Sequence, residues 1–442
     1  MQKEQIMNNK ILIRNFGPIK DAEIHLNNNF QILIGSQASG KSTLCKIVYF
    51  CQKIRDYTLD FLMNSEQFTK NHKNEYFNNY LKYMTKQFIG CFGTTKHMKR
   101  FRITYLFDEK KIEICLNNDG YVRFSFNDIL KMEIYSLIEE ASDMFLNRLN
   151  NEVASIMDNI TAIGVMKRHL TEVLFSIFKN EAEIIYIPAG RSLLATMSEQ
   201  LHDISVSEMD LTMQEFVKLI RATKSQFGTK IPEMVQNYTK TVKGQINNSA
   251  VTHAYELIKK ILKADYVNDS DGEKIYFDEH HWVKLMYGSS GQQEALWILM
   301  LTLIIILENR RAFVVIEEPE AHLFPIAQKD MISLIALMVN ATDSRVIITT
   351  HSPYILTSSN ILLYSEKVEN NYRGEEKPVI PRSIRLSYHK FAAYKVENAA
   401  DSLTSLMDEN SHMISTNYID KVSEITNNEL EHLLDMEIND DM

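Results

Sequence analysis

Hydrophobic residues along the first 53 positions follow two different periods. Short apolar and alternating runs predict strands, separated by an Asn-Phe-Gly-Pro turn and an Asn-rich turn, over residues 11–14, 22–26 and 30–34. From Ser42 to about Lys53 the apolar spacing changes to three and four residues, which places Leu44, Ile47 and Cys51 on one helix face. The opening segment therefore predicts strands, then a loop, then a helix.

The middle of the chain alternates a β-rich stretch with long helical stretches. An antiparallel meander, with a hairpin turn at Asp119-Gly120, is predicted from β-rich runs at 101–107, 111–116 and 121–126. Apolar residues at helical spacing then predict helices over about 128–180 and 193–265. A short strand, Glu183–Ile187, separates these two helical stretches.

The pattern changes again after residue 273. A hairpin is expected over 274–277 and 282–285, followed by a buried helix over 292–307. Two continuous apolar strands, Phe313–Ile316 and Val346–Thr349, flank a helix near 326–339. Apolar strands joined by helices predict a largely parallel sheet that is covered on both faces. The tail from about 394 is expected to be helical and acidic.

Composition and charge narrow the class of protein. The chain has 442 residues, for which a prior of about three domains applies, and a net charge of −9 that disfavours extensive nucleic-acid binding. Its four cysteines form no Cys-x-x-Cys pair, which predicts free thiols in a reducing compartment. The N-terminus lacks the apolar core of a signal peptide, and the longest apolar run, 295–307, falls short of the ~20 residues of a membrane span. We expect a cytoplasmic protein without a membrane segment.

The first motif with a chemical meaning follows the strand at 30–34. Its residues match the phosphate-loop pattern G-x-x-x-x-G-K-[ST] in full: Gly35, Ser36, Gln37, Ala38, Ser39, Gly40, Lys41 and Ser42. In such a loop the backbone amides and the helix N-terminus face the phosphates of ATP, to which the lysine adds positive charge. The serine hydroxyl is a Mg²⁺ ligand. We include the next residue, Thr43, in the predicted nucleotide site.

Polar residues also follow the later apolar strands. Glu317 and Glu318 end the strand that starts at Phe313, where Glu317 would hold Mg²⁺ and Glu318 would act as general base toward the attacking water. His351 follows the strand at 346–349 and could contact a γ-phosphate. The run Ser289, Ser290, Gly291 and Gln292 opens the apolar helix and offers amides to an anion, or simply caps that helix.

The order of these motifs resembles that of ABC-type ATPases, in particular their SMC-like and OLD-like branch. Residues 288–292 stand in the place of the signature loop, Phe313–Glu318 resembles a Walker B strand, and Glu318–Leu323 resembles the E-P-E-x-H-L run of compact OLD-like ATPases. Arg191, after Gly190, is the nearest counterpart of the Q-loop and is a predicted nucleotide-site residue. The resemblance covers about 1–50 and 183–365.

The resemblance implies an α/β fold, with an ABC-type ATPase head that has a mixed, largely parallel sheet, an antiparallel β subdomain and an inserted helical lid subdomain. It divides the chain into head segments at 1–51, 183–192 and 273–393, insertions at 52–182 and 193–272, and a helical acidic tail at 394–442. It further implies ATP hydrolysis and a head-to-tail dimer around two ATP molecules, with a higher homo-oligomer left open.

Three functions stay open at this point. The resemblance favours a sensor or regulatory ATPase of a two-component anti-phage defence system, such as PARIS or Septu, which would control a separate nuclease or toxin. A DNA-repair or DNA-clamp ATPase of the RecF or SMC-like type is the second, since Lys96, Lys99, Arg100 and Arg102 are interleaved with His97 and Phe101 and could contact nucleic acid. The same residues could instead form a solvated turn before a strand, which the acidic net charge favours. A scaffold that binds ATP with little turnover is the third.

Overall fold

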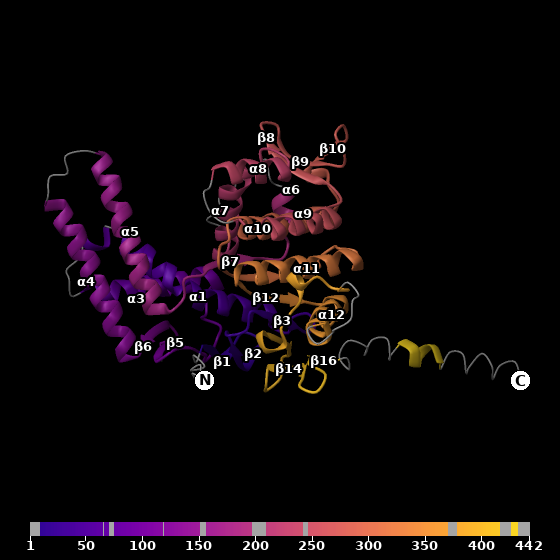
Figure 1. Cartoon of the computed structure of the whole chain (residues 1–442). Coiled ribbons are helices and arrows are strands. Elements are labelled where there is room, and N and C mark those ends of the chain that lie inside the picture. Colours follow the sequence, from indigo (N-terminus) through magenta and orange to yellow (C-terminus); the bar gives the residue numbers. More distant parts are fainter. Residues whose placement is uncertain are drawn as a thin grey trace, which may run out of the picture.

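The structure is a computed structural model, and the residues it describes fall into three connected parts. These residues are 9–64, 66–69, 75–117, 119–150, 156–196, 209–241, 246–369, 378–415 and 426–431. A central sheet with its helices lies between an antiparallel β subdomain, which carries two projecting helices, and a helical subdomain (Figure 1). The α/β fold expected from the sequence, with its largely parallel sheet and both subdomains, is confirmed.

The central sheet has six strands in the order β14-β13-β3-β12-β11-β7. Five of these strands run parallel, and only β14 is antiparallel to its neighbour. Their bounds are β3 Phe30–Ile34, β7 Glu183–Ile187, β11 Ala312–Glu317, β12 Arg345–Thr350, β13 Phe391–Val396 and β14 Leu403–Ser405. Strands β7, β11 and β12 are apolar along most of their length because both faces of a parallel sheet are covered, whereas β3 includes Gln31 and β13 includes Lys395.

Four helices cover the two faces of this sheet. Helix α1, Lys41–Met63, packs on one face, and its first turn follows β3 directly after the predicted loop. On the other face lie α10, Ser290–Leu307, α11, Pro325–Thr342, and α12, Pro353–Glu369. Helix α10 is apolar enough for a membrane span by composition, yet 83% of it is buried inside the protein. A helix that is apolar on all sides is a core helix in this position.

The antiparallel sheet joins the N-terminus to the meander. Its strand order is β2-β1-β4-β5-β6, with β1 Lys10–Phe16, β2 Ile19–His25, β4 Arg102–Phe107, β5 Lys110–Leu116 and β6 Val122–Phe126. Strand β1 pairs with both β2 and β4. The expected boundary between 1–51 and 52–182 therefore separates strands of one sheet, and it also falls inside α1.

Helices pack against this sheet and project beyond it. They are α2 Glu66–Thr69, α3 Tyr76–Phe92, α4 Asp128–Asn150 and α5 Ile156–Phe178. The helical stretch expected over 128–180 is thus two helices, and α4 and α5 extend away from the central sheet in Figure 1. Helix α3 is fixed by aromatic contacts, in which Phe88 lies edge-on to Phe16 and Phe50.

The helical subdomain lies over α10 and α11 (Figure 1). Its elements are α6 Ser192–Thr196, α7 Leu211–Lys224, η3 Ser225–Phe227, α8 Ile231–Thr241, α9 Asn248–Leu262 and η4 Leu285–Tyr287, with the strands β8 Asp265–Asp269, β9 Gly272–Tyr276 and β10 Trp282–Lys284. The predicted hairpin is therefore a three-stranded sheet, β10-β9-β8, because β8 continues from the end of α9.

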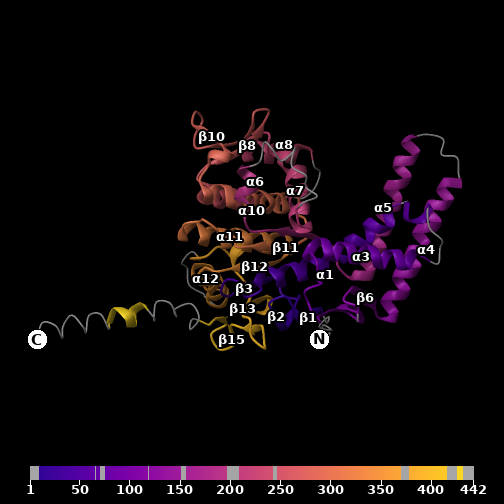
Figure 2. The ribbon, with the colours of Figure 1, turned by 180° about the vertical axis from the view of Figure 1, so that it is seen from behind.

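Residues 394–415 differ from the expected helical tail, whereas residues 426–431 are helical. Strand β13 pairs in parallel with β3, as Figure 2 shows from behind, and the boundary predicted at 394 falls inside this strand. Two short strands, β15 Met407–Asp408 and β16 Met413–Ile414, pair with each other farther along. The pairing of β13 joins residues more than 350 positions apart, so local periodicity could not reveal it. The acidic end, 432–442, lies outside the described residues.

Candidate functional site

The register of the parallel strands brings the predicted site residues to one edge of the sheet. Ile34 at the end of β3 pairs with Thr350 at the end of β12, and Thr349 pairs with Glu317 at the end of β11. Strand β7 ends beside Ile316. The segments that follow these four strand ends are the phosphate loop (35–42), His351, Glu318 and the turn before Arg191.

The phosphate loop requires glycine at its first position. A Cβ built at Gly35 would lie 2.2 Å from the carbonyl oxygen of Val396 on β13, so no larger residue fits. Gly40 has φ of 105° and Ala38 has φ of 58°, which turns the loop sharply before α1 begins at Lys41. The loop geometry is therefore set by close contact with the strand that the sequence did not predict.

Lys41 lies inside the curve of the loop. Its ammonium donates hydrogen bonds to the carbonyl oxygens of Gly35 at 2.8 Å and Ser36 at 2.9 Å. Burial lowers the pKa of Lys41, while nearby carboxylates, first Glu318, act against this lowering. The ammonium is thus a largely desolvated cation that faces acidic groups across the sheet edge.

The remaining loop residues differ in their exposure to solvent. Ser36, Gln37, Ala38 and Ser42 are exposed, Thr43 is half-buried, and Ser39 is buried. The Ser39 hydroxyl has no hydrogen-bond partner among the described residues. The exposed face of the loop and the first turn of α1 are open to solvent, and the binding of a phosphate group and a cation there stays a prediction from the motif.

Glu317 is a buried carboxylate with one oxygen available. Its Oε2 accepts a hydrogen bond of 3.1 Å from the amide of Ala189, whereas its buried Oε1 has no partner among the described residues. An unpartnered buried carboxylate oxygen at a phosphate loop fits a hard cation such as Mg²⁺. Tyr186 lies nearby: burial first, and the charge of Glu317 next, raise the pKa of its hydroxyl.

Glu318 and His351 meet beside the loop. The Glu318 Oε1 atom lies 3.3 Å from His351 Nε2, and both side chains are about one third exposed, at 38% and 35%. Glu318 has a positive φ of 45°, held by hydrogen bonds of 3.1 Å from its amide to the carbonyl and hydroxyl oxygens of Thr349. Such a conformation costs a non-glycine residue about 1–2 kcal/mol. The residue in this conformation is the one for which the sequence predicts a water-activating carboxylate.

Glu320 is a site residue that the sequence analysis did not single out. Its Oε1 accepts hydrogen bonds from the Thr350 hydroxyl at 2.6 Å and from the His351 amide at 2.8 Å. Burial raises its pKa against these bonds. It therefore fixes the segment that carries His351. The E-P-E-x-H-L spacing contained the signal, because this second carboxylate follows the same strand end.

Arg191 follows the end of β7, as expected, but its side chain lies inside the protein. Its guanidinium is fully buried and donates to four backbone carbonyls, with distances of 2.6 Å to Pro188, 2.7 Å to Glu317, 2.8 Å to Glu294 and 2.9 Å to Glu318. It also lies 3.4 Å from the Glu294 carboxylate. Because its donors are used inside the protein, Arg191 positions the end of β11, and the nucleotide-contacting role predicted for it is not supported.

The residues expected to form a signature loop cap α10. The Ser289 hydroxyl accepts from the Gln292 amide at 3.3 Å, and Gln292 Oε1 accepts from the Ser289 amide at 3.0 Å, which forms a capping box. Gly291 packs so closely that its Cβ would lie 2.7 Å from the carbonyl oxygen of His322. Ser289 and Ser290 are exposed at this tip. Gln292 is tied inward through its bond to the Leu262 carbonyl, so the exposed serines carry any outward contact.

The basic patch near residue 100 is only partly available to nucleic acid. Lys96, Lys99, Arg100 and Arg102 are exposed, but Phe101 is 2% exposed and packs against Phe16. Phe101 is therefore part of the core, because β4 begins directly after it. His97, the other aromatic residue of this stretch, is exposed, so contact with nucleic acid through the patch stays a prediction.

Comparisons with known proteins identify the family of the chain. A family model described as an AAA ATPase domain matches residues 7–356, which contain the phosphate loop, both glutamates and His351. No curated protein matches the chain in sequence.

Three solved structures are similar to the chain at low sequence identity. One is an SmcHead bound to the C-winged helix domain of ScpA, with 13% identity and a TM-score of 0.43, covering 92% of this chain and 98% of that one. The second is an Smc head domain with an extended coiled coil, bound to the C-terminal domain of ScpA and derived from Pyrococcus furiosus, with 12% identity, a TM-score of 0.40 and coverage of 95% and 99%. The third is an SMC head domain from Thermotoga maritima, with 9% identity, a TM-score of 0.34 and coverage of 80% and 91%.

The family model spans more than three quarters of the chain and contains every strand end that forms the site. The chain belongs to the AAA ATPase domain family.

Proposed function

We propose that this protein hydrolyses ATP and uses the reaction as a conformational switch. The observation that carries the proposal is the meeting of a phosphate loop, an unpartnered Glu317 oxygen and the Glu318–His351 pair at one sheet edge. Ser42 and Glu317 would hold Mg²⁺, whose charge offsets that of the phosphates. Lys41 would leave the loop carbonyls to contact the phosphates.

In this proposal Glu318 accepts the proton of the attacking water. Its strained backbone directs the carboxylate to the open side of the strand end, and His351, at 3.3 Å, limits its orientation. Glu320 holds the amide of His351, and Arg191 holds the carbonyls of Glu317 and Glu318. In this proposal a few side chains contact the substrate, and two buried residues, Glu320 and Arg191, hold the segments that carry them.

The test compares Glu318→Gln with Lys41→Ala and with Glu109→Gln, an exposed carboxylate in the turn between β4 and β5. Loss of a general base slows turnover by about 10²–10⁴-fold. We therefore expect Glu318→Gln to bind ATP with near wild-type affinity and to hydrolyse it at least about 100-fold more slowly. Lys41→Ala should lose ATP affinity, and Glu109→Gln should match the wild type. Rapid hydrolysis by Glu318→Gln would overturn the assignment.

A head-to-tail dimer around two ATP molecules belongs to the same proposal. Ser289 and Ser290 are exposed at the N-terminus of α10, where the Ser290 amide and hydroxyl could reach a phosphate held by a second copy. Light scattering should find a dimer of Glu318→Gln with ATP and a monomer of Lys41→Ala. A monomer in both cases would contradict the dimer and leave the ATPase assignment to its own test.

The last part of the proposal is that this ATPase controls a separate defence effector. Only the E-P-E-x-H-L run at 318–323 supports it. Its test is co-purification of a neighbouring gene product, a nuclease or toxin, with and without ATP. ATPase stimulation by DNA with steep salt dependence would instead favour a DNA clamp.

A further inference from the structure

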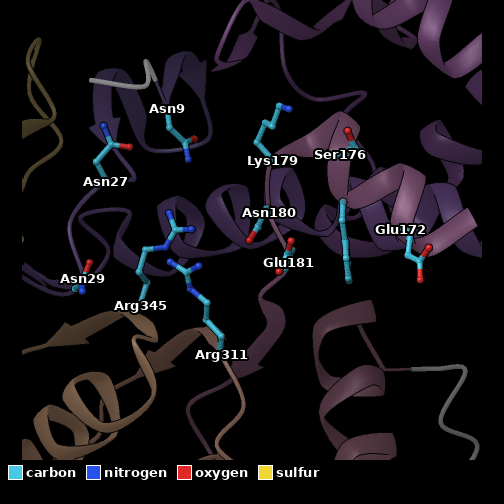
Figure 3. Close-up of a pocket in the computed structure, with 11 residues that line it drawn as sticks. Asn9, Asn27, Asn29, Glu172, Ser176, Lys179, Asn180, Glu181, Arg311 and Arg345 are labelled. Carbon is cyan, nitrogen blue, oxygen red and sulfur yellow. The ribbon is translucent and has the colours of Figure 1, made fainter. Parts of the chain in front are cut away.

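A cavity lies at the opposite edge of the central sheet from the phosphate loop. Its volume is about 790 Å³. Its wall includes Arg345, the first residue of β12, and the residues directly before two other strands, Arg311 before β11 and Asn29 before β3. We call it the Arg345 pocket (Figure 3). The same strands carry the ATP-site residues at their other ends.

Two guanidinium groups of the Arg345 pocket lie side by side. Figure 3 shows the side chains of Arg311 and Arg345 extending next to each other toward the space below Asn9. Arg311 pairs with Asp343 at 2.9 Å, whereas Arg345 donates at 3.0 Å to the carbonyl of Leu26. Among the described residues, no carboxylate oxygen lies within salt-bridge distance of Arg345. Burial, and then the charge of Arg311, lower the pKa of Arg345. A half-buried cation beside a like charge is unfavourable unless an anion joins it.

Other residues that line the Arg345 pocket add a positive charge, a hydrogen-bond acceptor and an apolar surface. Lys179 adds a third cation, and Asn9 has a buried Oδ1 with no partner among the described residues. Phe175, whose ring lies 5.0 Å from the Arg55 guanidinium, forms an apolar side. Glu172 and Glu181 also line the cavity. Acidic residues in the wall disfavour a long polyanion and favour a small ligand with donors of its own.

We propose that the Arg345 pocket binds a small phosphate-bearing ligand of mononucleotide size, at a site separate from the ATP site. The cavity volume falls in the range of about 300–1,000 Å³ of small-molecule sites. One phosphate can bridge two guanidiniums through charge-assisted hydrogen bonds, which removes their mutual repulsion. The unpartnered Asn9 oxygen accepts a hydrogen bond from a hydroxyl or amino group of the ligand.

Calorimetry on the full chain tests the proposal with the four ribonucleoside 5′-monophosphates and inorganic phosphate as probes. The variants are Lys41→Ala, Arg345→Gln, the milder Lys179→Ala, and Arg123→Gln, an exposed arginine on β6, as matched control. Lys41→Ala should keep monophosphate binding, whereas Arg345→Gln should weaken it about 10- to 150-fold. ATP binding should show the reverse pattern, and Arg123→Gln should match the wild type in both.

Each outcome decides the proposal separately from the ATPase assignment. Circular dichroism shows whether Arg345→Gln is folded; if it is not, weakened binding by folded Lys179→Ala supports the site and unchanged binding contradicts it. The proposal is wrong if no probe binds with a Kd below about 1 mM. It is also wrong if binding is lost in Lys41→Ala but kept in Arg345→Gln. Competition by inorganic phosphate identifies the phosphoryl group as the part recognised.

Discussion

Arg191→Ala should destabilise the protein strongly, because one buried guanidinium joins three segments at the edge of the central sheet. Arg191 donates to the carbonyls of Pro188, Glu317 and Glu318, and it pairs with Glu294 of α10. The Glu294 carboxylate, 3% exposed, also accepts from the amides of Arg191 and Ser192. Burial acts to raise the pKa of Glu294, but the Arg191 charge and these amides lower it overall.

The expected loss of stability follows from the groups that Arg191→Ala leaves buried without a partner, namely the Glu294 carboxylate and several backbone carbonyls. Removal of one partner of a buried ion pair costs about 3–5 kcal/mol, since the other charge stays in the interior. Carbonyls without a donor cost up to about 1–3 kcal/mol each, which water entering the vacated space reduces. We therefore expect a loss of about 3–5 kcal/mol in the free energy of unfolding. Arg191→Lys should lie between, because an ammonium lacks the planar fork that reaches several carbonyls.

Urea unfolding followed by tryptophan fluorescence measures this loss. Trp297 on α10 is 2% exposed and packs on Tyr266, so it reports the core beside Glu294. Arg14→Ala is the matched control: Arg14 lies 3.7 Å from Asp21 in an exposed pair, worth at most about 1 kcal/mol. If Arg191→Ala unfolds within about 1 kcal/mol of the wild type, the positioning role assigned to Arg191 is refuted.

Three further predictions concern single contacts near the site. Gly35→Ala should abolish ATP binding and lower the melting temperature, since its Cβ would lie 2.2 Å from the Val396 oxygen. The control Gly164→Ala, in open space on α5, should keep ATP binding and the wild-type melting temperature. Equal melting temperatures for the two variants would contradict the predicted clash at Gly35. Glu320→Ala should cost about 1–3 kcal/mol and slow turnover, because the Thr350 hydroxyl and His351 amide lose their acceptor, whereas Glu320→Gln keeps it. Burial raises the pKa of Glu320 above its ordinary 4.5, so the folded state binds this proton more tightly than the unfolded state. Wild-type stability should therefore fall relative to Glu320→Gln as pH rises from about 4.5 through the raised pKa; parallel pH profiles in thermal unfolding would exclude this.

Much of the candidate site could be predicted from the sequence because its residues occur in short motifs. The phosphate-loop spacing at 35–42 and the paired carboxylates after Phe313 each follow a strand, and parallel pairing brings strand ends to one edge. The role of Arg191 could not be predicted in this way, although the residue follows a strand in the expected place. Its donors turn inward to carbonyls of β11, and no local pattern shows which way a side chain turns.

The amino-acid sequence by itself determined the phosphate loop, the apolar strands β3, β11 and β12 and the core helix α10, since each depends on the order of neighbouring residues. Tertiary structure alone decided that β13 joins β3, that β1 and β2 share a sheet with the meander, and that Glu320 holds His351. It also decided that Arg311 and Arg345 stand together at the far edge. These features depend on contacts between residues far apart in the chain, and only the packing of the whole chain selects such contacts.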